Sequence, residues 1–364
     1  MESFSKPYFS IVIPTKDRVE LAKKVVFHNL AQTNQDFEIV LVDNGESTEL
    51  YEWAVDLNDP RIQPYRSGGL SMPDNWQFAF EKCRGEVVLM SEDKIFLQQD
   101  TLQKCSEAFK KSDAKFITWC IGYEPSHPQY EKTNTSGYNK QHSDELIKFA
   151  LEGRLDLYQK TAPRAINMAV RRSFALDVQK KVGRLCVPIS PDYSFGSFLL
   201  AESDFYLHTY DKFSYILHGA PSNGTEVMKG SEKGKKFFME MGISLEDYVA
   251  SMPCKTPLFG NMLLADILEF WKKTRLGNLT SQINLKSYWL MILSEILLAR
   301  KMIGIKSSLA VSAQREIKAL PVFFRFKLFF YLLNRFYTGW PNRKLKMRKN
   351  FVDFLGGIKV LIIP

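Results

Sequence analysis

Short apolar runs alternate with amphipathic stretches over the first 120 residues. Three apolar runs of strand length stand at Tyr8–Ile13, Phe37–Val42 and Glu86–Met90. Between them, Val19–Gln32 and Leu50–Leu57 have the periodicity of helices. The other elements predicted up to residue 120 are a strand at 62–65, a helix from the Ser71–Asp74 capping box to about Lys82, a helix at 101–110 and a strand at 115–120. This alternation predicts an α/β fold with a mostly parallel central sheet and helices on both faces.

Polar clusters follow three of the predicted strands. PTKDR (14–18), DNGES (43–47) and SED (91–93) each begin where an apolar run ends. The carboxyl ends of parallel strands lie at one edge of a sheet, and ligands bind beyond that edge in such folds. The pattern therefore predicts that these three clusters meet at a ligand site.

After residue 120 the pattern changes. The stretch 121–143 is polar and predicts a loop, and a predicted helix at 144–152 and a strand near 166–170 follow it. A segment rich in Gly, Ser and Lys at 219–236 predicts a mobile loop or linker. Further helices are predicted at 258–273, 285–302 and 322–337. The chain therefore divides into regions 1–120, 121–254 and 255–364, of which the last is helical.

Charge is divided unevenly along the chain. The 364 residues carry a formal net charge of +9 at pH 7. Residues 255–364 contain 19 Lys and Arg against 5 Asp and Glu, which leaves 30 basic and 35 acidic residues in the rest of the chain. The basic character therefore belongs to the C-terminal region alone.

The cysteines and the apolar runs exclude several classes of protein. Five cysteines without CxxC spacing fit free thiols in a reducing compartment and argue against a disulfide framework or a zinc site. The most apolar segment, 320–333, is interrupted by Arg325 and Lys327, so we expect no membrane-spanning helix. The run Tyr8–Ile13 is too short for a secretory signal, and we expect a cytoplasmic protein.

Three strand-and-cluster segments in order resemble the family 2 glycosyltransferases. The segments are FSIVIPTKDR, FEIVLVDNGEST and RGEVVLMSEDK. They match a strand ending in a Pro-Thr motif, a strand ending in an Asp-containing turn, and a strand ending in an Asp-x-Asp motif. The intervening SMPDNWQFAFEKCRGE keeps the family's Asn and Gly at Asn75 and Gly85. The resemblance covers residues 8 to 120 well and 165 to 220 loosely.

The resemblance implies a Rossmann-like GT-A domain of the bacterial surface-polysaccharide type. Residues 1–120 would form its nucleotide-sugar-binding half and residues 121–254 its acceptor-binding half. Such an enzyme would move a sugar, with inversion, from a nucleotide-diphosphate sugar to a hydroxyl of a glycan or lipid-linked acceptor. The segment 219–236 would then close over the bound donor through its lysines.

The resemblance assigns the donor site to residues at the strand ends. Asp43 would accept a hydrogen bond from the base or ribose, and Arg18 would be available to phosphate. The predicted donor-binding residues are Pro14, Thr15, Arg18, Asp43, Asn44, Asn75, Glu92 and Asp93. A structural alternative is that Asp43 and Asn44 form an Asx turn ahead of Gly45 and that Arg18 is a solvated residue of a first helical turn.

Glu92 and Asp93 occupy the place of the family's metal-binding motif. Their hard oxygen ligands suit Mg²⁺ or Mn²⁺, and adjacent carboxylates repel each other unless a cation or hydrogen-bond donors compensate them. We predict a divalent cation there, with Asp93 and Glu92 as ligands and His218 as a third, since some GT-A enzymes carry a late His. The sequence departs from the family at Glu92 and at Lys94, which would take over part of the neutralisation. A polar loop with Ser91 or Asp93 as a helix cap is the alternative.

An acceptor-activating base is expected in the second half of the domain. The resemblance places it at Asp192 in VPISPDYSFGSFLL, where a carboxylate would take the proton of the attacking hydroxyl. Asp204 and Glu202 are nearby competitors, and an N-terminal helix cap is the structural alternative for Asp192.

The C-terminal segment 320–351 interleaves aromatic and basic side chains. This pattern favours an anionic membrane surface on the cytoplasmic side, so we predict a peripheral membrane protein. A plain helical appendage, a nucleic-acid surface and a partner-docking helix are the alternatives, with nucleic acid disfavoured.

Two other functions compete with glycosyl transfer. A sugar-nucleotide pyrophosphorylase needs a glycine-rich phosphate loop after the first strand, and PTKDR contains no glycine. A non-catalytic nucleotide-sugar-binding or membrane scaffold protein on a degenerate GT-A fold stays open because of Glu92. Donor hydrolysis would separate that alternative from an enzyme.

Overall fold

The computed structural model describes most of the chain as two compact units. The described residues are 6–124, 126–127, 137–188, 190–217, 226, 231–277, 283–303, 308–328 and 330. One unit, here called the sheet unit, comprises Met1–Lys148, Asp156–Pro221 and Asp266–Thr280. The other, the helical unit, comprises Phe149–Leu155, Ser222–Ala265 and Ser281–Pro364. Residues of both predicted halves, 1–120 and 121–254, contribute strands to the sheet unit.

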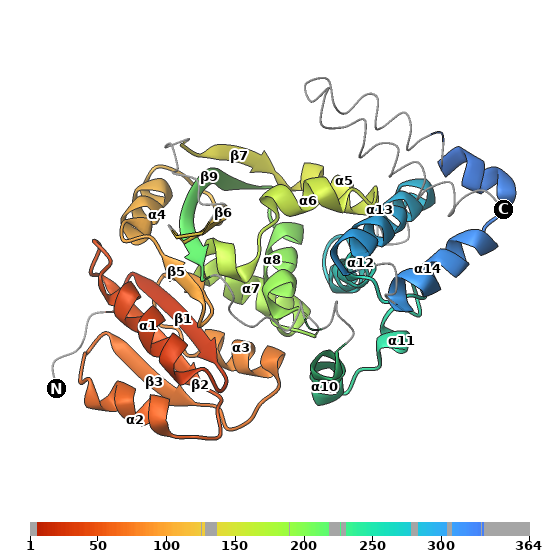
Figure 1. Ribbon diagram of the computed structural model, residues 1–364. Coiled ribbons are helices and arrows are strands. Elements are labelled where there is room, and N and C mark those ends of the chain that lie inside the picture. The colour runs from red at the N-terminus through yellow and green to blue at the C-terminus, as the bar shows by residue number, and fades with distance from the viewer. Residues whose placement is uncertain are drawn as a thin grey trace. The chain divides into compact units, whose positions relative to one another are not determined.

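Within the described residues, the sheet unit contains one nine-stranded sheet in the order β3-β2-β1-β4-β8-β6-β9-β5, with β7 paired to β9 (Figure 1). The strands are β1 (Phe9–Thr15), β2 (Phe37–Asp43), β3 (Ile62–Arg66), β4 (Val87–Met90), β5 (Ile95–Leu97), β6 (Phe116–Tyr123), β7 (Asn139–His142), β8 (Met168–Arg171) and β9 (Phe205–Ile216). Strands β1 to β4 pair in parallel, as β6 and β9 do, whereas β8 is antiparallel to β4 and β6. The predicted GT-A-type α/β fold is confirmed.

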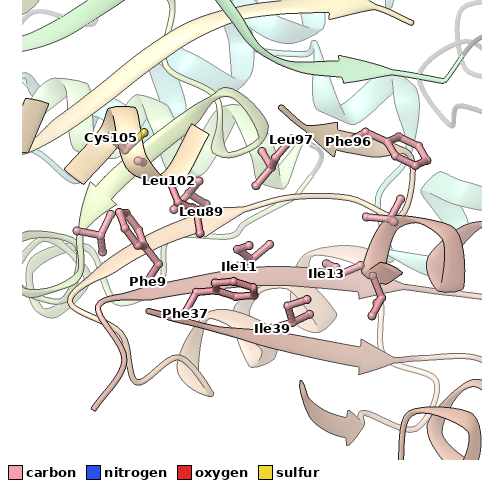
Figure 2. Close-up of a cluster of buried hydrophobic side chains, with 14 of the residues drawn as sticks. Phe9, Ile11, Ile13, Phe37, Ile39, Leu89, Phe96, Leu97, Leu102 and Cys105 are labelled. Carbon is pink, nitrogen blue, oxygen red and sulfur yellow. The ribbon is translucent and has the colours of Figure 1, made fainter. Parts of the chain in front are cut away.

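Helices cover the two faces of the parallel strands. The helices of the sheet unit include α1 (Val19–Leu30), α2 (Glu49–Asp56), α3 (Met72–Glu81), α4 (Thr101–Lys110), α7 (Arg172–Val182) and α8 (Pro191–Ala201). Alternate residues of β1 and β2 join α1, α2 and α4 in one buried cluster, whose labelled members Figure 2 shows. The intervening residues face the other side of the sheet, where α3 contacts β1 and β2. Burial on both faces explains the continuous apolar runs in the sequence.

Most predicted elements before residue 120 form where the sequence places them. Ser71 begins α3 as expected, because its side chain accepts a hydrogen bond from the Asp74 amide at 3.4 Å. The strand β5 follows Lys94 directly. It was not predicted, because three residues are too few to show the alternation of side chains that marks a strand. The prediction of a continuous loop at 121–143 is wrong at both ends. The strand β6 continues to Tyr123, Asn139–His142 form β7, an edge strand with mostly exposed polar side chains, and Ser143 begins a helix.

Two of the three predicted C-terminal helices are confirmed as α12 (Phe259–Trp271) and α13 (Leu285–Ile303). The helical unit includes α13 together with α10 (Glu232–Glu240), α11 (Leu245–Tyr248) and α14 (Ser308–Ala319), while α5 (Ser143–Leu151) and α12 span the boundary between the units. Residues 232–236, predicted to end a loop, open α10 instead, because Ser231 accepts a hydrogen bond from the Gly234 amide. Residues 322–328 are helical, and 331–337 of the third predicted helix lie outside the described residues. None of the described helices is both long and apolar enough to cross a membrane.

Candidate active site

The ends of β1, β2 and β4 bring the predicted donor residues to one edge of the sheet. In the parallel register Thr15 pairs with Asp43, and Val12 pairs with Met90. The backbone continues this alignment past the strands, because the Asn44 amide donates to the Thr15 carbonyl and the Ser91 amide to the Val12 carbonyl. The three polar clusters therefore lie side by side, as the sequence predicts.

Asp43 is a buried carboxylate with one oxygen engaged and one left over. Its Oδ1 accepts a hydrogen bond from the Gly45 amide at 2.9 Å, which is the Asx turn of the structural alternative. Its Oδ2 is buried without a hydrogen-bond partner, and the nearest cation is Arg66 Nη1 at 3.8 Å. Arg66 itself donates to the carbonyls of Gly45 and Ser47 and so holds the turn. The turn fixes Asp43, and its Oδ2 keeps an unused capacity to accept a hydrogen bond.

Asn44 and Asn75 fasten the loop that follows β3. The Asn44 side chain donates to the Leu70 carbonyl and accepts from the Leu70 amide, each at 2.7 Å. The Ser67 hydroxyl lies 2.9 Å from Asn44 Oδ1 and 2.7 Å from Asn75 Oδ1. Both predicted donor residues thus contact their own chain, and they shape the edge of the site by holding residues 67–70 in place.

The acidic residues after β4 are paired with neighbouring side chains. Asp93 is 4% exposed and accepts hydrogen bonds from Thr15 Oγ1 at 2.6 Å and from Arg18 Nη1 at 2.9 Å. Lys94 forms an ion pair with Glu92 at 2.8 Å. The Ile95 amide donates to the Glu92 carbonyl, so this segment is a tight turn between β4 and β5. The turn links two strands, and the predicted alternative of a helix cap here is wrong.

The antiparallel strand β8 brings Arg164 to the same edge. Val88 of β4 pairs with Val170 of β8, so the start of β8 lies near the end of β4. The 3₁₀ turn η1 (Ala165–Asn167) precedes β8 and contacts both β4 and α8. Arg164, at the start of this turn, donates from Nε and Nη2 to Asp192 Oδ2 at 2.8 and 2.5 Å. Asp192 is 6% exposed and lies in the first turn of α8.

The electrostatics of Arg164 link Asp192 to the acidic turn after β4. Burial by itself would lower the pKa of Arg164, but its interactions with Tyr193, Asp192 and Glu92 outweigh burial and raise that pKa. The guanidinium also stacks over the Tyr193 ring, with 4.5 Å between Cζ and the ring centroid. The predicted base and the predicted metal-binding residue therefore share one basic neighbour.

Gly196 allows α8 to approach Arg164 closely. A Cβ atom at this position would lie 1.9 Å from the Pro163 carbonyl oxygen and 3.0 Å from the Arg164 amide nitrogen. Both are backbone atoms, which cannot move aside as a flexible side chain would. The absence of a side chain at Gly196 thus permits the contact that places Arg164 against Asp192.

A divalent cation does not fit the described side chains as they stand. Asp93 is engaged by Thr15 and Arg18, and Glu92 is engaged by Lys94. Within the described residues, no group of three or more His, Cys, Asp or Glu side chains is placed to hold a metal ion. His218, the third predicted ligand, lies outside those residues.

The structure brings together most of the predicted residues and adds three. Arg66, Arg164 and Gly196 were not predicted from the sequence. Arg66 ends β3, so the rule that placed the other strand-end clusters could have found it. No local sequence pattern marks Arg164 or Gly196 as site residues, because their role depends on the pairing of β4 with β8. Asp204 pairs with Arg275, and Glu202 with Lys181, so both competitors for the role of base have partners of their own.

The sequence matches a known protein-family model over the residues that form most of the sheet. The family model described as Glycosyl transferase family 2 matches residues 10–178. None of the curated proteins is a significant match to this sequence.

Several solved structures are similar in fold at low sequence identity. S. aureus TarS 1-349 in complex with UDP-GlcNAc is 13% identical, with a TM-score of 0.49 over 85% of this chain and 87% of that one. The mannosyltransferase PcManGT from Pyrobaculum calidifontis, in complex with GDP-Man and Mn²⁺, is 11% identical, with a TM-score of 0.45 over 85% and 86%.

Proposed function

Residues 10–178 belong to a family 2 glycosyltransferase domain, and from this premise we propose that the protein transfers a sugar from a nucleoside-diphosphate sugar to a hydroxyl acceptor. The observation that carries the proposal is the buried Asp43 Oδ2 without a hydrogen-bond partner, at the edge where β1, β2 and β4 end. A buried carboxylate oxygen that accepts no hydrogen bond from the protein, and whose ion pair with Arg66 is long at 3.8 Å, is costly unless a ligand donates to it. The N–H of a nucleobase or the hydroxyl of a ribose supplies such a donor.

Asp192 is the proposed base. It would accept the proton of the acceptor hydroxyl as that oxygen attacks the anomeric carbon. The bond from the anomeric carbon to the diphosphate oxygen breaks in the same step, and its electron pair leaves with the nucleoside diphosphate. Attack from the side opposite the leaving group gives inversion. The two hydrogen bonds from Arg164 orient the carboxylate for this step.

The acceptor is proposed to be a glycan or a lipid-linked glycan of the cell surface. The predicted Mg²⁺ or Mn²⁺ enters no step of this mechanism, because the carboxylates that would bind it are paired with basic side chains.

A panel of sugar donors tests the proposal. The full-length protein is screened by thermal shift against UDP-, GDP-, CMP- and dTDP-sugars, with and without Mn²⁺. Donors that raise the unfolding temperature are then incubated with protein, and released nucleotide is measured. Binding with slow donor hydrolysis supports a transferase. Binding without any release, even with candidate acceptors, would support the non-catalytic scaffold.

The C-terminal region is proposed to attach the protein to an anionic membrane surface. Residues 322–328 and 330 are helical, and Phe323, Phe326 and Phe330 follow each other at helical spacing. Their exposed fractions are 71%, 42% and 64%. An exposed aromatic stripe on one face of a basic helix is what a bilayer interface binds. The basic segment from 331 to 351 lies outside the described residues, and its part in this proposal rests on its sequence.

Vesicle flotation tests the attachment. We expect the full-length protein to float with phosphatidylserine-containing vesicles and to stay behind with pure phosphatidylcholine. The triple variant F323S/F326S/F330S is expected to lose flotation, whereas Met239→Ser, at a residue 69% exposed in α10, serves as the matched control. Flotation of the triple variant equal to wild type would contradict the role of the stripe, and truncation after residue 320 then tests the remaining tail.

A further inference from the structure

Four carboxylates at the candidate site each have a basic side chain of this chain nearby. Asp93 pairs with Arg18 at 2.9 Å, Glu92 with Lys94 at 2.8 Å, and Asp192 with Arg164 at 2.5 Å. The fourth carboxylate, Asp43, has Arg66 at 3.8 Å. These four carboxylates therefore present no excess of negative charge to a divalent cation.

Binding a metal ion at the turn after β4 would require these pairs to break. A divalent cation held by Asp93 and Glu92 would displace Arg18 from one carboxylate and Lys94 from the other. Both displaced side chains would then stand close to the ion and repel it. Lys94 and Glu92 are only 12% and 15% exposed, so water screens this repulsion poorly.

The same arrangement suits a diphosphate. The Lys94 ammonium has three N–H donors, and one contact with Glu92 leaves donors for an incoming anion. The backbone of Lys94 is fixed on both sides by hydrogen bonds. The Lys94 carbonyl accepts one from the Leu217 amide, and the Ile95 amide donates one to the Glu92 carbonyl. Lysine at such a fixed position serves as a point charge for phosphate.

We infer that Lys94 takes the place of a divalent cation at the diphosphate, so that this protein binds its donor without a metal. The inference rests on the proposed function and specifies how its donor site works. As the bond between the anomeric carbon and the diphosphate breaks, negative charge grows on the departing diphosphate. Lys94 neutralises that charge while the acceptor proton passes to Asp192.

Calorimetric binding of nucleoside diphosphates tests the inference. The full-length protein is titrated with UDP, GDP, CDP and dTDP in EDTA and again in Mn²⁺. For the diphosphate that binds, we expect dissociation constants within about twofold of each other in the two buffers. Lys94→Met is expected to weaken binding in EDTA by about 10- to 100-fold, and Lys94→Arg to keep most of it. Lys180→Met, which removes the lysine of an exposed ion pair on α7, is the matched control and should bind as wild type does.

A charge reversal sharpens the test. Lys94→Asp creates a run of three carboxylates after β4, which offers oxygen ligands and leaves Arg18 as the remaining competitor for Asp93. We expect this variant to bind poorly in EDTA and to recover affinity by about 10-fold or more in Mn²⁺. Thermal unfolding of each variant shows whether it is folded before the titrations are compared.

The outcomes separate the inference from the proposed function. Wild-type binding that appears only with Mn²⁺ overturns the inference and leaves the proposed function standing. Binding in EDTA that Lys94→Met and Lys180→Met weaken equally, or not at all, also overturns it. If no nucleoside diphosphate binds in either buffer, both are overturned.

Discussion

The buried carboxylates of the two units are stabilised in different ways. In the sheet unit, Asp93 and Asp192 each accept hydrogen bonds from an arginine. In the helical unit, Glu295 of α13 forms no ion pair with any described basic side chain: its Oε1 accepts a hydrogen bond from the Gly260 amide at 2.6 Å, and its Oε2 has no hydrogen-bond partner among the described residues. Gly260 lies in the first turn of α12, so the carboxyl group faces the amides at a helix N-terminus.

The difference shows what burial does to a carboxyl group with and without a basic partner. Burial raises the pKa of Glu295 to about 7, although hydrogen bonds from the amides of Gly260 and Asn261 oppose that shift. An arginine carries a full positive charge that neutralises a buried carboxylate, whereas backbone amides carry only partial positive charges. With its pKa near 7, Glu295 is about half protonated at neutral pH.

Asp192→Asn is the substitution with the largest expected effect. It keeps the size of the side chain but removes the proton acceptor, so we expect turnover to fall by about 10²- to 10⁴-fold with donor affinity unchanged. Released nucleotide gives the rate, and calorimetry gives the affinity. Asp204→Asn, at a side chain 88% exposed, is the control and should keep wild-type turnover. Near-normal turnover of Asp192→Asn would place the base elsewhere.

Glu295→Gln tests the contrast through pH. The folded pKa of about 7 lies above the ordinary value of 4.5, so the folded state holds a proton that the unfolded chain has released. Stability should therefore fall as pH rises from about 4.5 to about 7, by roughly 3 kcal/mol, and change little above that range. Urea unfolding at pH 5 and pH 8 measures this loss, which Glu295→Gln should remove. Glu232→Gln, 87% exposed, should leave the pH dependence in place; equal behaviour of the two variants would refute the assignment.

Asp43→Ala tests the carboxylate that is left partly unsatisfied. Loss of a hydrogen bond between a ligand and a charged oxygen should weaken nucleoside-diphosphate binding by about 10- to 100-fold. Asp43→Asn, which keeps an acceptor oxygen, should lose less. Isothermal titration with the diphosphate that binds wild type measures both, with Asp113→Asn on the exposed surface as the control. Unchanged affinity of Asp43→Ala would show that Oδ2 does not contact the ligand.

Lys180→Met gives the smallest expected change. Lys180 and Asp177 form an exposed ion pair, with side chains 77% and 67% exposed. Water screens this pair, so its removal should alter the free energy of unfolding by no more than about 0.5 kcal/mol. A larger loss of unfolding free energy in urea would contradict the comparison, because it would show that an ion pair need not be buried to stabilise the fold.

The N-terminal half of the fold follows closely from the sequence. Its strands are buried on both faces and therefore read as continuous apolar runs, and the chain returns to the same sheet edge after each helix. For this reason Thr15, Asp43 and Asp93 could be assigned to one site from local pattern alone. The short strand β5 and the polar edge strand β7 escaped prediction, because three or four residues carry too little periodicity to be recognised.

The sequence by itself determined the strand-and-helix order up to β4, the acidic cluster that follows β4 and the concentration of basic residues beyond 255. These are properties of neighbouring residues, and local periodicity and composition record them. Only the tertiary structure decided which charges meet. Arg164 reaches Asp192 because β8 pairs antiparallel with β4 and because Gly196 lets α8 approach, and Arg18 reaches Asp93 across 75 positions of the chain. Such pairs depend on strand register and close packing between distant segments, which no local pattern encodes.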